Sequence, residues 1–188
     1  MTRTTGQLRS ELVRAGAVLL ERTGAEEAVT LRAVAREAGV SAPAVYGHFA
    51  DLTALLDAVV AEGFDELRAR ILAAVEPLAD PVDRLVAGCR AYVEAGLVAP
   101  VRYRAMFGGR RGSGGEAFAV LVDGVSACVT AGRSGSEDPA ADAALLWTAL
   151  HGVVTLRVTG ADPSWPDQDT LVRTLVGRLA RIRGDDPA

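Results

Sequence analysis

The sequence predicts an all-α protein of about nine helices, and its length leaves room for one large domain or for a small domain joined to a larger one. Apolar residues recur at spacings of three to four along most of the 188 residues, which is the pattern of amphipathic helices. Alternating polar and apolar runs of strand length are nearly absent. Hydrophobic residues make up 49% of the chain and charged residues 23%, so the chain can bury a core.

Helix starts in the first part of the chain are marked by N-cap residues, and helix ends by Gly or Pro. The N-caps are Thr30, Ser41 and Asp51, and the stops are Gly24, Gly39 and Pro77. Together with the apolar spacing, these signals predict four helices. The predicted helices cover residues 6–23, 30–38, 41–47 and 51–75.

Five further helices are predicted in the rest of the chain. Asp80 and Asp138 are N-caps that precede a proline at the first helical position, where proline is tolerated. Ser113 and Glu116 have the spacing of a capping box, and Asp167 caps the last helix. The predicted helices cover residues 80–97, 100–107, 113–131, 138–159 and 167–183.

The most specific pattern lies in residues 30–49, TLRAVAREAGVSAPAVYGHF. Two short helices joined by a glycine-bearing turn form a helix-turn-helix arrangement. Gly39 suits the left-handed backbone of such a turn. Val34, Ala35 and Val45 line the facing sides of the two helices, so short, mostly polar side chains remain outside. That outer surface fits a major groove about 12 Å wide.

Residues 31–56 resemble the DNA-binding domain of tetracycline-repressor-type transcriptional regulators. The shared pattern is Val-Ala-x-x-Ala-Gly-Val-Ser, then Val-Tyr-x-His-Phe, then a Leu-rich fourth helix. The resemblance implies a helix-turn-helix DNA-binding domain over residues 1–50 and a helical ligand-binding and dimerisation domain over residues 51–188. It also implies a homodimeric, cytoplasmic regulator that binds a palindromic double-stranded DNA operator as a repressor and is released by a small molecule.

The resemblance implies which residues of this chain contact DNA. Tyr46 and His48 match positions that contact backbone phosphates, with ordinary packing and a surface histidine as the alternatives. Ala42 and Ala44 are expected to face the bases, where a methyl group can meet a thymine methyl. The two helix N-termini suit phosphate, although simple capping is equally expected there. The predicted DNA-binding residues are Thr30, Arg32, Ser41, Ala42, Ala44, Tyr46 and His48.

One departure from the family pattern concerns the start of the fourth helix. The family usually places a Lys two or three residues after His-Phe, facing the DNA backbone, whereas this chain has Ala50-Asp51-Leu52-Thr53. Asp51 is interpreted as the N-cap of the fourth helix. Fewer phosphate contacts are therefore expected, and backbone binding would depend on Arg3, Arg9 and Arg32.

A weaker resemblance lies in the C-terminal part. Residues 92–107, followed by Trp147 and His151-Gly152, are similar to the regulator subgroup named for a Trp-His-Gly signature. The helix that carries Trp147 and His151 is apolar almost all round, which predicts a cavity on one side and a partner subunit on the other. A core histidine beside a core tryptophan is the alternative. The residues predicted to bind an apolar ligand are Cys89, Tyr92, Tyr103, Phe107, Phe118, Trp147 and His151.

The last predicted helix carries an apolar stripe that favours dimerisation, as in the family. Packing within one subunit is the alternative. The predicted interface residues, which would act with the preceding helix, are Leu171, Leu175, Val176 and Leu179.

Several classes of protein are disfavoured by the sequence. The two histidines lie in different predicted domains, and no Gly-rich phosphate loop after a strand, nucleophile elbow or HExxH motif is present. No catalytic residue, metal or cofactor is therefore expected. Two cysteines make no disulfide framework, and a cytoplasmic, non-membrane protein is expected. A small-molecule-binding helical protein with lost or weak DNA binding stays open, as does, more remotely, a helical enzyme that uses His151 as a base.

Overall fold

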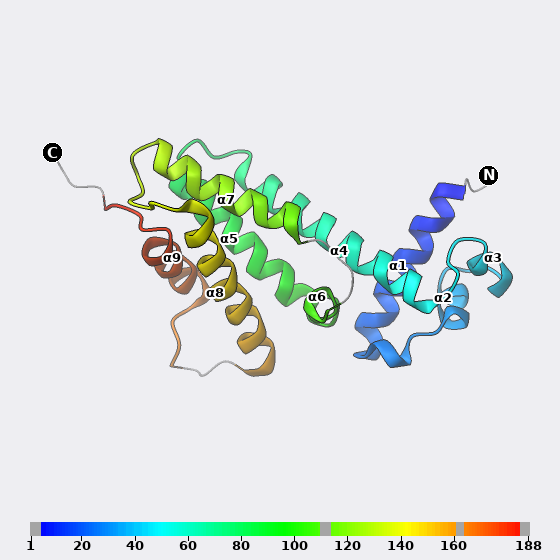
Figure 1. The fold of residues 1–188 in the computed structure, drawn as a ribbon. Helices are drawn as coiled ribbons and strands as arrows, with labels where there is room; N and C mark the ends of the chain where they lie inside the picture. The colour runs from blue at the N-terminus through cyan, green and yellow to red at the C-terminus, as the bar shows by residue number, and fades with distance from the viewer. Residues whose placement is uncertain (1–4, 110–113, 161–163, 185–188) are drawn as a thin grey trace. The chain divides into compact units, whose positions relative to one another are not determined.

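The computed structural model describes residues 5–109, 114–160 and 164–184. Within these residues it contains nine α-helices, one 3-10 helix and a single isolated β-bridge (Figure 1). The all-α prediction is therefore confirmed. The chain forms two compact units, one of residues 1–65 and 99–113 and the other of residues 66–98 and 114–188.

The first unit combines the N-terminal helices with one helix from later in the chain. Its elements are α1 (Thr5–Thr23), η1 (Glu26–Ala28), α2 (Leu31–Glu37), α3 (Ala42–Tyr46), the start of α4 (Leu52–Val75) and α6 (Pro100–Phe107). The domain boundary predicted at residue 50 differs from this division, because the beginning of α4 and the later helix α6 pack with the N-terminal helices. The 3-10 helix η1 was not predicted, since three residues are too few to show a helical period.

The core of the first unit forms where α1 meets α4. Gly16 of α1 lies so close to α4 that a Cβ atom there would be 2.8 Å from the Cδ2 atom of Leu55 and 3.1 Å from the Cγ2 atom of Val59. Leu55 and Val59 are fully buried. Gly16 therefore permits a close helix contact that fixes the position of α1 against the start of α4.

Aromatic rings hold α6 in the first unit. The Phe107 ring of α6 lies 5.6 Å from the Phe64 ring of α4 in an edge-to-face arrangement, and 4.8 Å from the Tyr103 ring. Gly63 lies against the Met106 side chain. Such aromatic pairs add about 0.5–1.5 kcal/mol each beyond the area that they bury.

The second unit is a helical bundle in which α5 is central. Its elements are the end of α4, α5 (Pro81–Val98), α7 (Gly115–Thr130), α8 (Pro139–Gly160) and α9 (Gln168–Leu179). Helix α5 packs against α7, α8 and α9 (Figure 1). Val93 of α5 and Leu146 and Leu150 of α8 are buried between these helices.

The last helix ends earlier than the predicted residue 183. Helix α9 ends at Leu179, and Arg181 has a left-handed φ of 49°. Residues 180–183 then pair with residues 133–135, because the Gly135 N–H donates to the Arg181 carbonyl at 2.9 Å and the Arg183 N–H to the Arg133 carbonyl at 2.9 Å. The predicted start of α7 at Ser113 lies outside the described residues, and α7 begins at Gly115.

Candidate functional site

The helix-turn-helix segment is built by α2, a tight turn and α3. Gly39 has a φ of 66°, which favours glycine, and the Val40 N–H donates to the Ala35 carbonyl at 2.9 Å to close the turn. Val34, Ala35 and Val45 are buried as predicted. The inner faces of the two helices are thus fixed by packing, which leaves the outer face of α3 to recognise a partner.

The two predicted N-caps behave differently. The Thr30 hydroxyl accepts a hydrogen bond from the Ala33 N–H at 3.1 Å, so this side chain caps α2. Ser41 occupies the N-cap position of α3, but its hydroxyl makes no capping hydrogen bond to the described residues. Ser41 is exposed. Both hydroxyls can donate their O–H to a phosphate, because the Thr30 cap uses only an acceptor lone pair of that group.

The outer surface of α3 is small and carries one large side chain. Tyr46 is 59% exposed. Ala42, Ala44 and His48 are half-buried, and Arg32 of α2 is exposed. All seven predicted DNA-binding residues therefore lie in the α2–α3 segment and its borders, and Tyr46 is the exposed aromatic side chain among them.

The start of α4 confirms the interpretation of Asp51 as an N-cap, because its Oδ1 atom accepts a hydrogen bond from the Ala54 N–H at 2.8 Å. The carboxylate is thus engaged at the helix N-terminus, where negative charge is stabilising.

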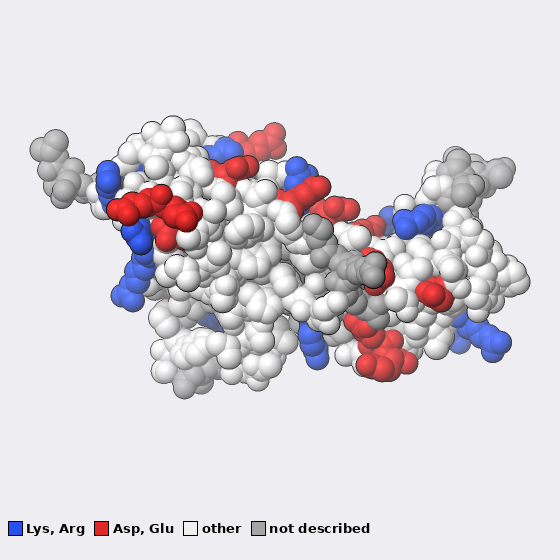
Figure 2. Space-filling model, in the orientation of Figure 1, with Lys and Arg blue, Asp and Glu red and all other residues white. Residues whose placement is uncertain are grey.

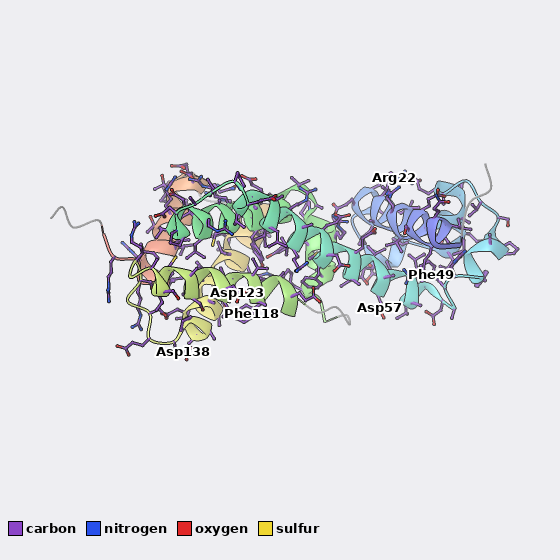
Figure 3. The ribbon with its side chains drawn as sticks, turned by 90° about the horizontal axis from the view of Figure 1, so that it is seen from above. Arg22, Phe49, Asp57, Phe118, Asp123 and Asp138 are labelled. Carbon is purple, nitrogen blue, oxygen red and sulfur yellow. The ribbon has the colours of Figure 1, made fainter. Side chains whose placement is uncertain are left out.

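A cation from α1 lies beside the same turn. The Arg9 Cζ atom is 5.1 Å from the centre of the Phe49 ring, and Phe49, labelled in Figure 3, directly follows His48. This cation–π contact holds the guanidinium near the α3–α4 turn. Arg3 lies outside the described residues.

Charge alone would not identify this surface. On the face drawn in Figure 2, acidic and basic side chains are interspersed. Arg22 of α1 is paired with Glu37 of α2 at 2.8 Å, so one cation of this unit is already engaged. The mixed surface charges and the net charge of −4 together predict only modest electrostatic attraction to DNA.

The second unit contains a cavity of about 410 Å³ lined by α4, α5, α7 and α8. Most of its wall is apolar. The aliphatic lining side chains are Ile71, Leu72, Val75, Leu85, Val120, Leu121 and Leu150. This size and lining are typical of small-molecule sites.

Three charged residues also line the cavity. Arg84 donates from its Nη1 atom to the carbonyls of Val75 and Leu78, at 2.8 and 2.9 Å, and so caps the C-terminus of α4. The Arg68 Nε atom lies 3.6 Å from a Glu116 carboxylate oxygen in an exposed pair. The third charged residue, Asp123, is labelled on α7 in Figure 3. None of these charged residues was predicted, since charged residues on helices usually face solvent.

Three of the seven predicted ligand-binding residues, Cys89, Tyr92 and Trp147, line this cavity. The Trp147 ring contacts Tyr92 at 4.9 Å and Phe118 at 5.7 Å, both edge-to-face. His151 follows one turn later on α8 and is half-buried. The lining described for the cavity belongs to the second unit, whereas Tyr103 and Phe107 pack in the first unit. Tyr103 and Phe107 are thus not part of the lining described for this cavity, and their role in ligand binding stays a prediction.

Two segments of the chain match family profiles. Residues 12–59 match bacterial regulatory proteins of the tetR family, and residues 85–179 match the tetracyclin repressor-like C-terminal domain. The second match alone covers half of the chain. The chain belongs to the tetracycline-repressor family. It is a DNA-binding transcriptional regulator, and regulators of this family bind DNA and act as dimers. The Trp-His-Gly subgroup is not confirmed by these matches.

Solved structures share the fold of this regulator. A protein of unknown function from Rhodococcus sp. RHA1 is 30% identical over 96% of this chain and 97% of that chain, with a TM-score of 0.82. A tetR-family regulatory protein from Rhodococcus RHA1 is 23% identical over 94% and 97%, with a TM-score of 0.67. PfmR from Thermus thermophilus, a TetR-family transcriptional regulator, is 19% identical over 92% and 98%, with a TM-score of 0.66. No curated protein sequence matches the chain.

Helix α8 of the regulator presents an uncharged outer face. Leu145 and Leu156 are 57% and 48% exposed. A Cβ atom built at Gly152 meets no described atom within 4 Å. Of the described helices, α8 is also the one that is long and apolar enough to cross a membrane by length and composition, a test that core helices of soluble proteins also pass. An apolar outer face on a helix of a soluble protein indicates a contact surface.

Helix α9 buries one of the predicted interface residues within its own subunit. Val176 is 1% exposed and Val172 is fully buried, so both belong to the core of the second unit. Leu171, Leu175 and Leu179 are half-buried. Gly177, like Gly152, has no described atom within 4 Å of a Cβ atom built there. Residues next to the predicted stripe therefore form most of the solvent-facing surface of α9.

The buried thiols are poor nucleophiles. Burial, helped by nearby Cys128, raises the pKa of Cys89 to about 12, and burial also raises the pKa of Cys128. Both stay protonated at neutral pH.

Among residues 5–109, 114–160 and 164–184, no cluster of His, Cys, Asp and Glu side chains could hold a metal ion.

Partial burial lowers the pKa of His151 below its ordinary value of 6.5. The unfolded chain then binds a proton that the folded state binds less readily, so stability is full above pH 6.5 and falls as the pH drops towards the lowered pKa. We expect the urea midpoint of the wild-type protein to fall more between pH 7.5 and pH 5.5 than that of His151→Gln. His48→Gln, which removes the other histidine, is the control. Equal losses in wild type and His151→Gln would contradict this assignment.

Proposed function

We propose that this regulator is a homodimeric repressor that binds a palindromic operator and is released by an apolar small molecule in the α4–α5–α7–α8 cavity. The observation that carries the DNA-binding part is the α2–α3 segment, with its inner face fixed by packing and Tyr46 and Ser41 exposed on its outer face. We expect it to act in the cytoplasm without a catalytic step.

The operator geometry follows from symmetry. A two-fold dimer would present two α3 helices to successive major grooves, about 34–36 Å apart. Ala42 and Ala44, the short side chains of α3, would face base edges. Tyr46, His48 and the Ser41 hydroxyl would contact phosphates.

The outer face of α8 supports dimerisation through α8 and α9. Gly152 and Gly177 lie inside helices, where glycine costs about 1 kcal/mol relative to alanine. Packing within the subunit does not require either glycine, because a Cβ atom at each position meets no described atom within 4 Å. A closely approaching helix of a second copy explains both, since small residues let helices come close.

The cavity supports ligand control. Its aliphatic wall and the Tyr92–Trp147 pair suit an apolar molecule. Such a ligand would lower operator affinity only if it binds the DNA-free conformation more tightly, and operator would then weaken ligand binding by the same factor.

Selection of duplexes from a random DNA pool by the purified protein, at near-physiological salt, tests this proposal. Enrichment of a palindrome with half-sites one helical turn apart is expected. A folded dimer that enriches no sequence would instead favour a ligand-binding protein with lost DNA binding, and would make Leu52, where the family has Lys, the first position to change.

Arg9 is expected to supply a phosphate contact near the position of the missing Lys, because its guanidinium lies over Phe49. Arg9→Gln should reduce the salt dependence of operator binding by about one unit of slope. Fluorescence anisotropy over a series of salt concentrations measures this slope. Arg22→Gln is the matched control, since Arg22 lies on the same helix but is paired with Glu37. Equal slopes for the two variants would remove Arg9 from the interface.

A further inference from the structure

The N-terminus of α6 is capped by a side chain from a distant helix. Ala99, at the N-cap, has a methyl group that cannot accept a hydrogen bond, and Pro100 has no N–H. The Glu21 carboxylate of α1 takes the next two N–H groups: Oε1 accepts from Arg102 at 2.6 Å and Oε2 from Val101 at 3.4 Å. Glu21 therefore does for α6 what an N-cap side chain usually does from within the same helix.

The hydrogen bonds between Glu21 and the N-terminus of α6 are favoured by charge. An ionised carboxylate at a helix N-terminus combines charge-assisted hydrogen bonds with the favourable end of the helix dipole. Glu21 is half-buried, so water competes less for it than for an exposed acid. The start of α6 is thereby tied to the end of α1.

Glu21 also connects α6 to the DNA-binding surface. Helix α1 packs against α2, and α2 packs against α3. A displacement of the α6 N-terminus would therefore move the end of α1 or break two hydrogen bonds to Glu21. Either result would change the support of the helix-turn-helix segment.

On its other side, α6 is joined to the cavity through the backbone. Ala99 is the single residue between α5, which ends at Val98, and α6, which begins at Pro100. Cys89 and Tyr92 of α5 line the cavity. A ligand that shifts the C-terminal half of α5 would therefore act on the first residues of α6 through a link of one residue.

We propose that Glu21 is a positioning residue that couples occupancy of the cavity to the helix-turn-helix segment by holding the N-terminus of α6 to α1. This inference rests on the proposed function. Without the Glu21 carboxylate, the cavity would still bind a ligand and the DNA-binding surface would still bind operator. Binding at one site would, however, no longer change the affinity of the other.

Because coupling is reciprocal, operator DNA can serve as the effector and no small molecule is needed. Hydrogen exchange of the full-length dimer is measured free and with saturating selected operator. In wild type, operator is expected to change the exchange of α5 (residues 85–98) and of the α6 N-terminus. In Glu21→Ala, operator still binds, but the change in α5 is lost. Glu27→Ala, which removes an exposed acid of η1, should behave like wild type.

A second variant separates coupling from simple capping of α6. Ala99→Asp supplies an N-cap side chain from within α6 but no tie to α1. The double variant Glu21→Ala/Ala99→Asp should regain any stability lost by Glu21→Ala, measured by urea unfolding, yet still show no change in α5 exchange on operator binding. Recovery of the α5 change in the double variant would reduce Glu21 to a structural cap and overturn the proposal.

The remaining outcomes are also decisive. Persistence of the α5 change in Glu21→Ala overturns the proposal, as does a wild-type protein that binds operator without any change in α5. A wild-type dimer that binds no DNA at all is a different result, since it contradicts the proposed function itself.

Discussion

Replacing Tyr46 with alanine is expected to lower operator affinity by about tenfold to a hundredfold while the regulator stays folded. A hydrogen bond to a charged group contributes about 1.5–3 kcal/mol, and each 1.4 kcal/mol is about a factor of ten in affinity. Tyr46 is 59% exposed, so its removal should change the free energy of unfolding by less than about 0.5 kcal/mol. Fluorescence anisotropy with the selected operator and urea unfolding measure the two quantities.

Two further variants sharpen this result. Tyr46→Phe keeps the ring and removes the hydroxyl, so an equal loss assigns the effect to the hydrogen bond. Trp165→Ala removes another exposed aromatic side chain, in the segment between α8 and α9, and should leave operator affinity unchanged. If Tyr46→Ala bound operator as tightly as Trp165→Ala, the assignment of α3 as the recognition helix would be wrong.

Introducing a charge on the outer face of α8 is expected to dissociate the dimer. Leu145→Glu would bury an unpaired carboxylate twice in a two-fold interface, and one uncompensated buried charge costs about 3–5 kcal/mol. Dimer affinity should therefore fall by more than about a hundredfold, and operator affinity should fall with it because a monomer reaches one half-site. Analytical ultracentrifugation gives the dimer dissociation constant.

The matched control for Leu145→Glu is Val98→Glu. Val98 is 69% exposed at the end of α5, away from α8 and α9 in sequence, and its replacement should leave the dimer intact. Gly152→Leu provides an uncharged test, since its side chain meets open space within the subunit but would collide with a partner helix. A dimer that survives both Leu145→Glu and Gly152→Leu would place the interface elsewhere.

Features with local causes were predictable from the sequence. Thr30 and Asp51 cap their helices through N–H groups three residues away, and Gly39 adopts the left-handed turn that its position requires. Each depends on a few neighbouring residues. The helix-turn-helix segment was therefore predicted down to its buried face.

Features that depend on packing between distant segments were not predictable. Val176 belongs to an apolar stripe, but a stripe does not tell whether it faces its own subunit or a partner, and the structure turns Val176 inward. The sequence of α6 does not tell which neighbouring helix its aromatic side chains contact. In the structure, Phe107 contacts Phe64 of α4. The partners of Glu21 lie 80 and 81 residues further along the chain, and no spacing rule covers such a distance.

The composition of the first unit from two separate stretches of chain limits how regulators of this kind can be recombined. A chimera joined after residue 50 would bring in a foreign α6 together with the incoming ligand-binding part, and that unrelated helix would have to meet Glu21 of the retained α1. Exchanging ligand specificity between relatives while keeping control of DNA therefore calls for three junctions: one within α4 near residue 65, one at Ala99 and one before Gly114. Natural exchange of such halves should leave α1 and α6 inherited together.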